Sequence, residues 1–216
     1  MTDRIRVLLV DDQELIRLGY RLVLEASADL EVVGEAADGD EAVELARRLR
    51  PDVVVMDVRM PRLDGIAATA RIVADVPTAH VLIVTTFDLD EYTFGALQAG
   101  ASGFLLKDAT RDQLTSAVRC VHRGDAILAP RATRLLIQAY AAAPVQPTPD
   151  MPGSLTERER DVFVAIGRGL TNTEIAEQLF LSESTVKTHV GRILAKLEAR
   201  DRVHLVILAH RAGLVR

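Results

Sequence analysis

The chain has little of what marks secreted or membrane proteins. It contains one cysteine, Cys120, which excludes an internal disulfide and leaves that thiol without a second cysteine for a metal site. No apolar run approaches the roughly 20 residues that span a bilayer, and no signal-peptide pattern precedes the first apolar segment. We therefore expect no membrane association and a location in the reducing cytoplasm.

Charge is unevenly distributed along the chain. The 216 residues carry a formal net charge of −5, and 49% of them are hydrophobic, which is enough for one large core or two smaller ones. Residues 1–149 hold 22 acidic and 16 basic side chains, whereas residues 183–216 hold 3 acidic and 7 basic ones. Any nucleic acid would therefore meet the C-terminal end.

A short apolar segment, residues 53–56, ends at Asp57 and predicts a buried parallel strand with a carboxylate at its tip. Pro61 and Gly65 place a loop after it. Further strands are predicted at residues 4–10, 30–35, 80–85 and 103–106. They alternate with helical patterns at residues 15–24, 38–49, 65–74, 90–99 and 111–123. This alternation predicts an α/β fold, with a five-stranded, doubly wound parallel sheet covered by helices on both faces.

Five side chains suited to phosphate chemistry fall at carboxyl ends of these strands, where parallel strands share one sheet edge. They are Asp11, Asp12, Asp57, Thr85 and Lys107. The three carboxylates offer the hard oxygen ligands that Mg²⁺ prefers. With Mg²⁺ and Lys107 neutralising a phosphoryl group, Asp57 could attack it in line and Thr85 could bond the product. Strand-end Asp residues are often only turn formers or helix caps, but that alternative would have to hold throughout the set.

Residues 5–123 resemble the receiver domain of response regulators, which has a flavodoxin-like sheet. The motifs that carry the resemblance are Val10-Asp11-Asp12, Met56-Asp57-Val58-Arg59-Met60-Pro61-Arg62-Leu63-Asp64-Gly65, Thr85-Thr86-Phe87 and Gly103-Phe104-Leu105-Leu106-Lys107-Asp108. The resemblance implies that a sensor histidine kinase phosphorylates Asp57 and that Asp11 and Asp12 bind Mg²⁺. It also implies that Lys107 binds the phosphoryl group, with Thr85 and Phe104 as switch residues.

One position departs from a common receiver pattern. Many receivers carry Asn two residues after the phosphoacceptor, where this chain has Arg59. The resemblance implies that the Arg59 backbone carbonyl ligates the metal, which any residue type can supply. The cationic side chain, in contrast, could shield or steer attacking water and so alter the lifetime of the phosphoryl group.

A proline-rich segment divides the chain. Residues 144–153 contain four prolines, a composition that disfavours both helices and central strands and gives a semi-extended tether. Residues 130–143 before it have helical composition. We therefore predict a receiver domain at residues 1–125, a helical and proline-rich linker at residues 126–153, and a small all-α domain of four helices at residues 154–216.

The C-terminal segment has the pattern of a helix-turn-helix domain. Thr156 and Glu159 have capping-box spacing ahead of an apolar run. A short helix then begins at Thr171 or Asn172 and continues to Leu179. A tight link at residues 180–182 leads to a helix at residues 183–197, and a fourth helix covers residues 202–212.

The helix at residues 183–197 has an apolar stripe, and small and cationic residues on the rest of its surface. Small residues let a backbone approach a groove floor, and cations at the borders can reach phosphates. A solvated amphipathic helix is the alternative, but it would more often carry long Glu and Lys side chains on its outer face. The predicted DNA-contacting residues are Ser184, Thr185, Lys187, Thr188, His189, Gly191, Arg192 and Lys196.

Residues 154–213 resemble the LuxR-type DNA-binding domain. The matching motifs are Leu155-Thr156-Glu157-Arg158-Glu159, Gly169-Leu170-Thr171-Asn172-Thr173-Glu174-Ile175-Ala176 and Ser182-Glu183-Ser184-Thr185-Val186-Lys187-Thr188-His189-Val190. Some members have Lys where this chain has Gly191, so one DNA contact is expected to be missing. The order of the two domains is that of NarL/FixJ-type response regulators. It implies a transcription factor that a kinase controls and that dimerises on promoter DNA when phosphorylated.

Two other functions would use part of the same pattern. Phosphatases of the haloacid-dehalogenase type also use a strand-end Asp nucleophile with Mg²⁺ and Lys, but they need a second Asp two residues later as general acid. Arg59 stands there, so we predict no enzymatic turnover. A phosphorylation-independent DNA binder with a degenerate receiver is the other alternative, and the intact Asp11, Asp12 and Lys107 disfavour it.

Overall fold

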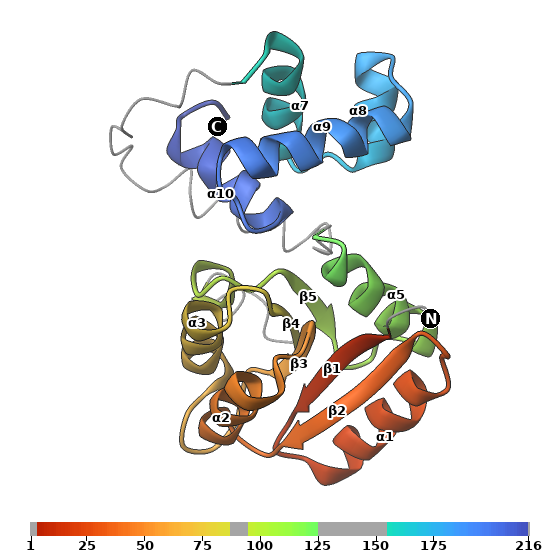
Figure 1. Cartoon of the computed structure of the whole chain (residues 1–216), viewed down its shortest axis with the longest axis vertical. Helices are drawn as coiled ribbons and strands as arrows, with labels where there is room; N and C mark the ends of the chain where they lie inside the picture. Colours follow the sequence, from red (N-terminus) through yellow and green to blue (C-terminus); the bar gives the residue numbers. More distant parts are fainter. Residues whose placement is uncertain (1–3, 87–94, 125–154, 216) are drawn as a thin grey trace. The chain divides into compact units, whose positions relative to one another are not determined.

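The computed structural model describes residues 4–86, 95–124 and 155–215, which fall into two compact units (Figure 1). The predicted linker, residues 126–153, lies outside the described residues together with the helix expected at residues 130–143. The limits proposed for the domains therefore remain a prediction. None of the helices in the described ranges is long and apolar enough to cross a membrane.

The first unit is built on the predicted parallel sheet. Its strands are ordered β2-β1-β3-β4-β5 and every neighbouring pair runs parallel. The strands are β1 (Ile5–Val10), β2 (Leu30–Ala36), β3 (Val53–Asp57), β4 (His80–Thr85) and β5 (Gly103–Leu106). The central strand β3 is buried along its whole length, which explains why its residues are apolar without alternation.

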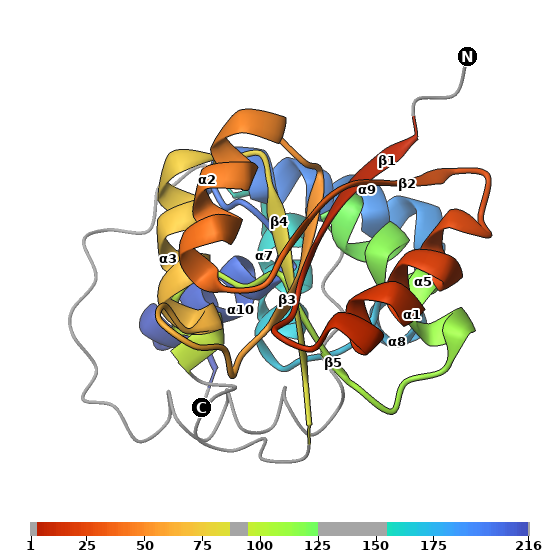
Figure 2. The same ribbon diagram turned by 90° about the horizontal axis from the view of Figure 1, so that it is seen from below.

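Helices cover both faces of this sheet, as predicted. Figure 2 shows α2 and α3 on one side of the strands and α1 and α5 on the other. These helices are α1 (Glu14–Glu25), α2 (Gly39–Leu49), α3 (Gly65–Asp75) and α5 (Arg111–His122). Of the helix predicted at residues 90–99, residues 95–98 are helical and residues 90–94 lie outside the described part.

The leucines that predicted α1 do not all face the core. Leu24 is completely buried, whereas Leu15, Leu18 and Leu22 are 83%, 50% and 63% exposed. Leu24 lies on the opposite side of the helix, which faces the sheet. Tyr20 packs against the same apolar core. The spacing therefore predicted the helix correctly, but it did not show which face the sheet covers.

The second unit is the predicted four-helix domain. Its helices are α7 (Glu157–Gly167), α8 (Asn172–Leu179), α9 (Glu183–Lys196) and α10 (Arg202–Arg211), packed around one apolar core. The Thr156–Glu159 capping box is present, and the Ser182 hydroxyl caps α9. Phe180 ends α8 in the left-handed region, at a φ of 55°, and so turns the chain sharply toward α9.

A close backbone approach beside Asp57 gives the first testable prediction. A Cβ added at Gly65 would lie 2.0 Å from the carbonyl oxygen of Asp57, so the backbone of Gly65→Ala must shift. We expect its free energy of unfolding in urea to fall by about 1–3 kcal/mol. Gly19→Ala is the control, because an added Cβ there meets nothing within 4 Å on α1. It should raise stability by roughly 0.5–1 kcal/mol. Equal stability of Gly65→Ala and wild type would contradict the close approach.

Candidate functional site

Three carboxylates meet at the edge of the sheet where the strands end. Asp11 and Asp12 follow β1, and Asp57 is the last residue of the neighbouring strand β3. One oxygen from each carboxylate lies within 4.8 Å of the other two. Asp11 and Asp57 are buried, at 2% and 4% exposure, whereas Asp12 is open to solvent. A group bound here would touch two fixed carboxylates and one accessible one.

Lys107 brings a buried positive charge to the same place. Its ammonium lies 2.9 Å from Asp57 Oδ2 and 2.7 Å from Asp11 Oδ2. The Lys107 backbone N–H also donates to the carbonyl of Thr85 at 2.8 Å, so these two strand-end residues are adjacent. Phe104 is buried in β5 and pairs with Ile83 of β4. Asp11, Asp12, Asp57, Thr85 and Lys107 therefore lie at the carboxyl edge of the sheet, whereas Phe104 lies within β5.

The charges in this cluster are not balanced. Burial raises the pKa of Asp57 and outweighs the Lys107 ammonium, which lowers it, and the nearby Asp11 charge raises it further. Burial alone would lower the pKa of Lys107, but its bonds to Asp11 and Asp57 raise it overall. Lys107 is therefore a fixed cation at neutral pH. Three carboxylates and one ammonium leave an excess of negative charge that can attract a divalent cation.

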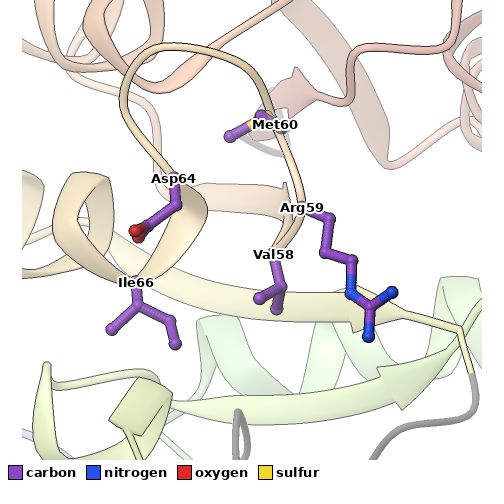
Figure 3. Close-up of a pocket in the computed structure, with 5 residues that line it drawn as sticks. All are labelled: Val58, Arg59, Met60, Asp64 and Ile66. Carbon is purple, nitrogen blue, oxygen red and sulfur yellow. The ribbon is translucent and has the colours of Figure 1, made fainter.

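The loop after Asp57 forms a shallow pocket next to this cluster. The pocket has a volume of about 450 Å³, and Figure 3 shows it between the two ends of the loop. Its lining comprises Val58, Arg59, Met60, Asp64 and Ile66. The Arg59 side chain extends away from Asp64 in this view, so the guanidinium stands at the side of the pocket opposite the start of α3.

Tyr20 was not predicted from the sequence. It lies on α1, its hydroxyl is buried, and no hydrogen-bond partner for that hydroxyl is found among the described residues. Burial raises the Tyr20 pKa, and the charges of Asp11 and Asp57 raise it further. Tyr20 therefore lies within electrostatic reach of the cluster as a neutral phenol. Its position in the sequence, in the helix that follows Asp12, is a signal too weak to identify it.

The predicted DNA-contacting face of α9 is largely open. Val186, Val190 and Ile193 are buried in the core, as the apolar stripe predicts. Ser184, Lys187, Thr188, Gly191 and Arg192 are exposed, and Thr185 and His189 are half-buried. A Cβ added at Gly191 would meet nothing within 4 Å, so the surface is flat there. The arrangement fits a helix whose outer face enters a groove.

Lys196 differs from the other predicted contacts. Its ammonium lies 2.7 Å from Oε2 of Glu159, a residue that is only 2% exposed. The bond from Lys196 and those from Thr156 lower the pKa of Glu159 to about 2. Lys196 therefore has a structural partner that its position on the helical wheel did not indicate, and that contact competes with a DNA phosphate for its charge.

Both parts of the chain match known protein families. The response regulator receiver domain matches residues 7–119, and the luxR family of bacterial regulatory proteins matches residues 153–209. The chain belongs to the two-component response regulators. Its sheet edge and its four helices thus correspond to the receiver and LuxR-type parts of such a regulator.

Relatives match this response regulator over nearly its whole length. The uncharacterized transcriptional regulatory protein YxjL of Bacillus subtilis is 44% identical, over 99% of this chain and 98% of its own. The response regulator protein VraR of Staphylococcus aureus is 38% identical, over 98% and 99%. Among solved structures, the response regulator ChrA of a heme-sensing two-component system is 36% identical over 98% and 99%, with a TM-score of 0.53. The regulator is therefore related to transcription regulators of the same two-domain organisation.

The raised pKa of Asp57 predicts how stability depends on pH. The folded regulator binds the Asp57 proton more tightly than the unfolded chain, so the cost of ionising Asp57 grows as the pH rises above the ordinary pKa of Asp and is complete above the raised pKa. Near pH 4, about the ordinary pKa of Asp, this cost disappears. Without Mg²⁺, Asp57→Asn should therefore unfold a few degrees above wild type at pH 7, and the gap should close near pH 4. Thermal unfolding in EDTA tests this, and a wild type more stable than Asp57→Asn at pH 7 would contradict it.

Proposed function

We propose that Asp57 is the phosphoacceptor of this response regulator and that a sensor histidine kinase supplies the phosphoryl group. The observation that carries the proposal is the buried Lys107 ammonium between Asp57 and Asp11. A cation in this position can neutralise oxygens of a phosphoryl group placed on Asp57. The alternative that each Asp is only a turn former does not account for a buried lysine shared between two of them.

The cluster fits a divalent cation. Asp11, Asp12 and Asp57 provide oxygen ligands within 4.8 Å of one another, and the effect of Asp11 on the Asp57 pKa reflects repulsion that a cation would relieve. We propose Mg²⁺, with the Arg59 backbone carbonyl as a further ligand. When bound there, the ion would neutralise negative charge on the oxygens of the transferring phosphoryl group.

In the transfer, the Asp57 carboxylate forms a P–O bond while the P–N bond of the donor phosphohistidine breaks, and the electron pair of that bond stays on the imidazole. Lys107 compensates the charge on the phosphoryl oxygens, and the Thr85 hydroxyl donates to one of them. Thr85 moves inward in this proposal and the buried Phe104 follows it. The altered surface then favours dimerisation and DNA binding.

We propose that the regulator is not an enzyme with turnover and that it acts in the cytoplasm, where promoter DNA and the kinase domain are found. The relationship to transcription regulators supports the absence of turnover. So does Arg59, since a dehalogenase-type phosphatase would need an acid at that position. In this proposal the Arg59 side chain acts only on the lifetime of the phosphoryl group.

The C-terminal domain is proposed to read DNA with the outer face of α9. Lys187 and Arg192 supply cations for phosphates. Ser184, Thr188 and Gly191 have small side chains or none, so the helix backbone can approach the base edges closely. A homodimer would place two such helices on adjacent half-sites. The local excess of bases in residues 183–216 supports this orientation.

Phosphorylation of Asp57 is directly testable. Incubated with acetyl phosphate and Mg²⁺, wild type should gain one phosphoryl group by intact-mass measurement, whereas Asp57→Asn should gain none. Asp40→Asn is the matched control, because it removes an exposed carboxylate at the start of α2 and should be labelled like wild type. Labelling of Asp57→Asn to the wild-type extent would refute the proposal.

Two lysines of α9 should behave differently on DNA. Lys187→Ala removes an exposed cation, so binding to duplex DNA should weaken and the slope of log K against log salt should fall by about 1. Lys196→Ala should retain the slope but lower the unfolding temperature, because it leaves the buried Glu159 without its cation. The stabilisation from Glu159 is present above its ordinary pKa and is lost as pH falls toward about 2, so the deficit should shrink in acid. If the salt slope fell in Lys196→Ala and not in Lys187→Ala, Lys196 would be the DNA contact and Lys187 would not.

A further inference from the structure

The loop between β3 and α3, residues 58–64, is anchored at both ends. The Val58 N–H donates to Asp57 Oδ1 at 2.8 Å, and the Val58 carbonyl accepts from Gly65 N–H at 2.9 Å. Asp64 caps α3 by accepting from the Ala67 N–H at 2.8 Å. Figure 3 shows the loop rising from Val58 past Met60 and returning to Asp64. The two ends of the loop are thus fixed to the tip of β3 and to the start of α3.

Arg62, in the second half of this loop, contacts Asp38 at the start of α2. Its guanidinium Nη2 forms an ion pair with Asp38 Oδ2, and the Asp38 side chain is completely buried. The other Asp38 oxygen accepts from the Glu41 N–H at 3.0 Å and caps α2. A buried carboxylate is strongly disfavoured without a cation. This ion pair therefore restrains the loop at Arg62 more strongly than an exposed ion pair would.

Two backbone features fix the same contact. Arg62 has a φ of 64°, in the left-handed region that residues other than glycine seldom adopt. One residue later, the Leu63 carbonyl accepts from the Gly39 N–H at 3.1 Å, and a Cβ on Gly39 would lie 2.4 Å from that oxygen. The N-terminus of α2 therefore contacts the loop at two points, the Arg62–Asp38 ion pair and the hydrogen bond from Gly39 to Leu63.

We propose that Arg62, acting through Asp38, is a positioning residue for the metal and phosphoryl site. Arg62 lies three residues after Arg59, with Pro61 limiting backbone freedom between them. The ion pair holds this short segment on α2, and the Arg59 carbonyl is thereby kept near Asp57. This inference rests on the proposed function, because it assigns Arg62 a role toward the same site.

The test uses variants of the full chain that keep the local backbone. Arg62→Asn removes the cation but tolerates a left-handed φ, and Asp38→Asn keeps a good helix cap while removing the carboxylate charge. Arg62→Lys keeps the charge. Arg47→Asn is the matched control, because Arg47 pairs with Asp75 and also joins α2 to α3, and it is not part of the Asp57 loop.

Mg²⁺ affinity of the unphosphorylated protein, measured by calorimetry, is the main readout. We expect Arg62→Asn and Asp38→Asn each to weaken Mg²⁺ binding roughly tenfold, and the double variant to weaken it no further. Arg62→Lys should recover part of the affinity, and Arg47→Asn should bind like wild type. Amide hydrogen exchange should quicken at residues 58–64 in Arg62→Asn but not in Arg47→Asn.

The outcomes separate this inference from the proposed function. Wild-type Mg²⁺ affinity in Arg62→Asn, or additive losses in the double variant, would overturn the positioning role even where Asp57 is phosphorylated normally. If Mg²⁺ binding depends on Arg62 but wild type takes no phosphoryl group at Asp57, the positioning role stands and the phosphoacceptor proposal fails. A wild type that binds no Mg²⁺ would overturn both.

Discussion

The site depends on one buried ammonium shared between two carboxylates from different strands. Lys107 follows β5, Asp57 ends β3 and Asp11 follows β1, so the contact ties together three strands that are spread across the sheet. Each carboxylate is desolvated, and neither would be stable there as an anion without a partner. Parallel pairing of the strands brings these ends to one edge. Lys107 then supplies the positive charge that stabilises the two buried carboxylates there.

Much of this site could be predicted because its geometry follows from topology. Buried parallel strands place their carboxyl ends on one edge whatever the loops contain, so Asp11, Asp57 and Lys107 were expected on the same edge once the strands were identified. The caps at Asp38 and Thr156 were equally predictable, since a cap is decided by residues within one turn. Local rules and sheet topology were sufficient for these features.

Contacts between elements that are distant in sequence were not predictable in this way. Periodicity showed that α1 and α9 are helices, but not that Leu15, Leu18 and Leu22 would face solvent. It also did not show that Lys196 would reach Glu159, 37 residues earlier. The Arg62–Asp38 pair is of the same kind, because it requires the relative placement of a loop and a helix end. A helical wheel describes one element, whereas these contacts depend on what packs beside it.

The charge of the site explains why a divalent cation and a phosphoryl group belong together there. Three carboxylates and one ammonium leave two negative charges, with carboxylate oxygens within 4.8 Å of each other. At that separation two like charges repel by roughly 3.5 kcal/mol for an effective dielectric constant of about 20. Phosphorylation replaces the Asp57 charge by roughly −1.5 to −2, so the repulsion grows unless a divalent ion offsets it. In the proposed mechanism, ion binding and phosphorylation therefore favour each other, and a loop that positions a ligand for the ion also influences the switch.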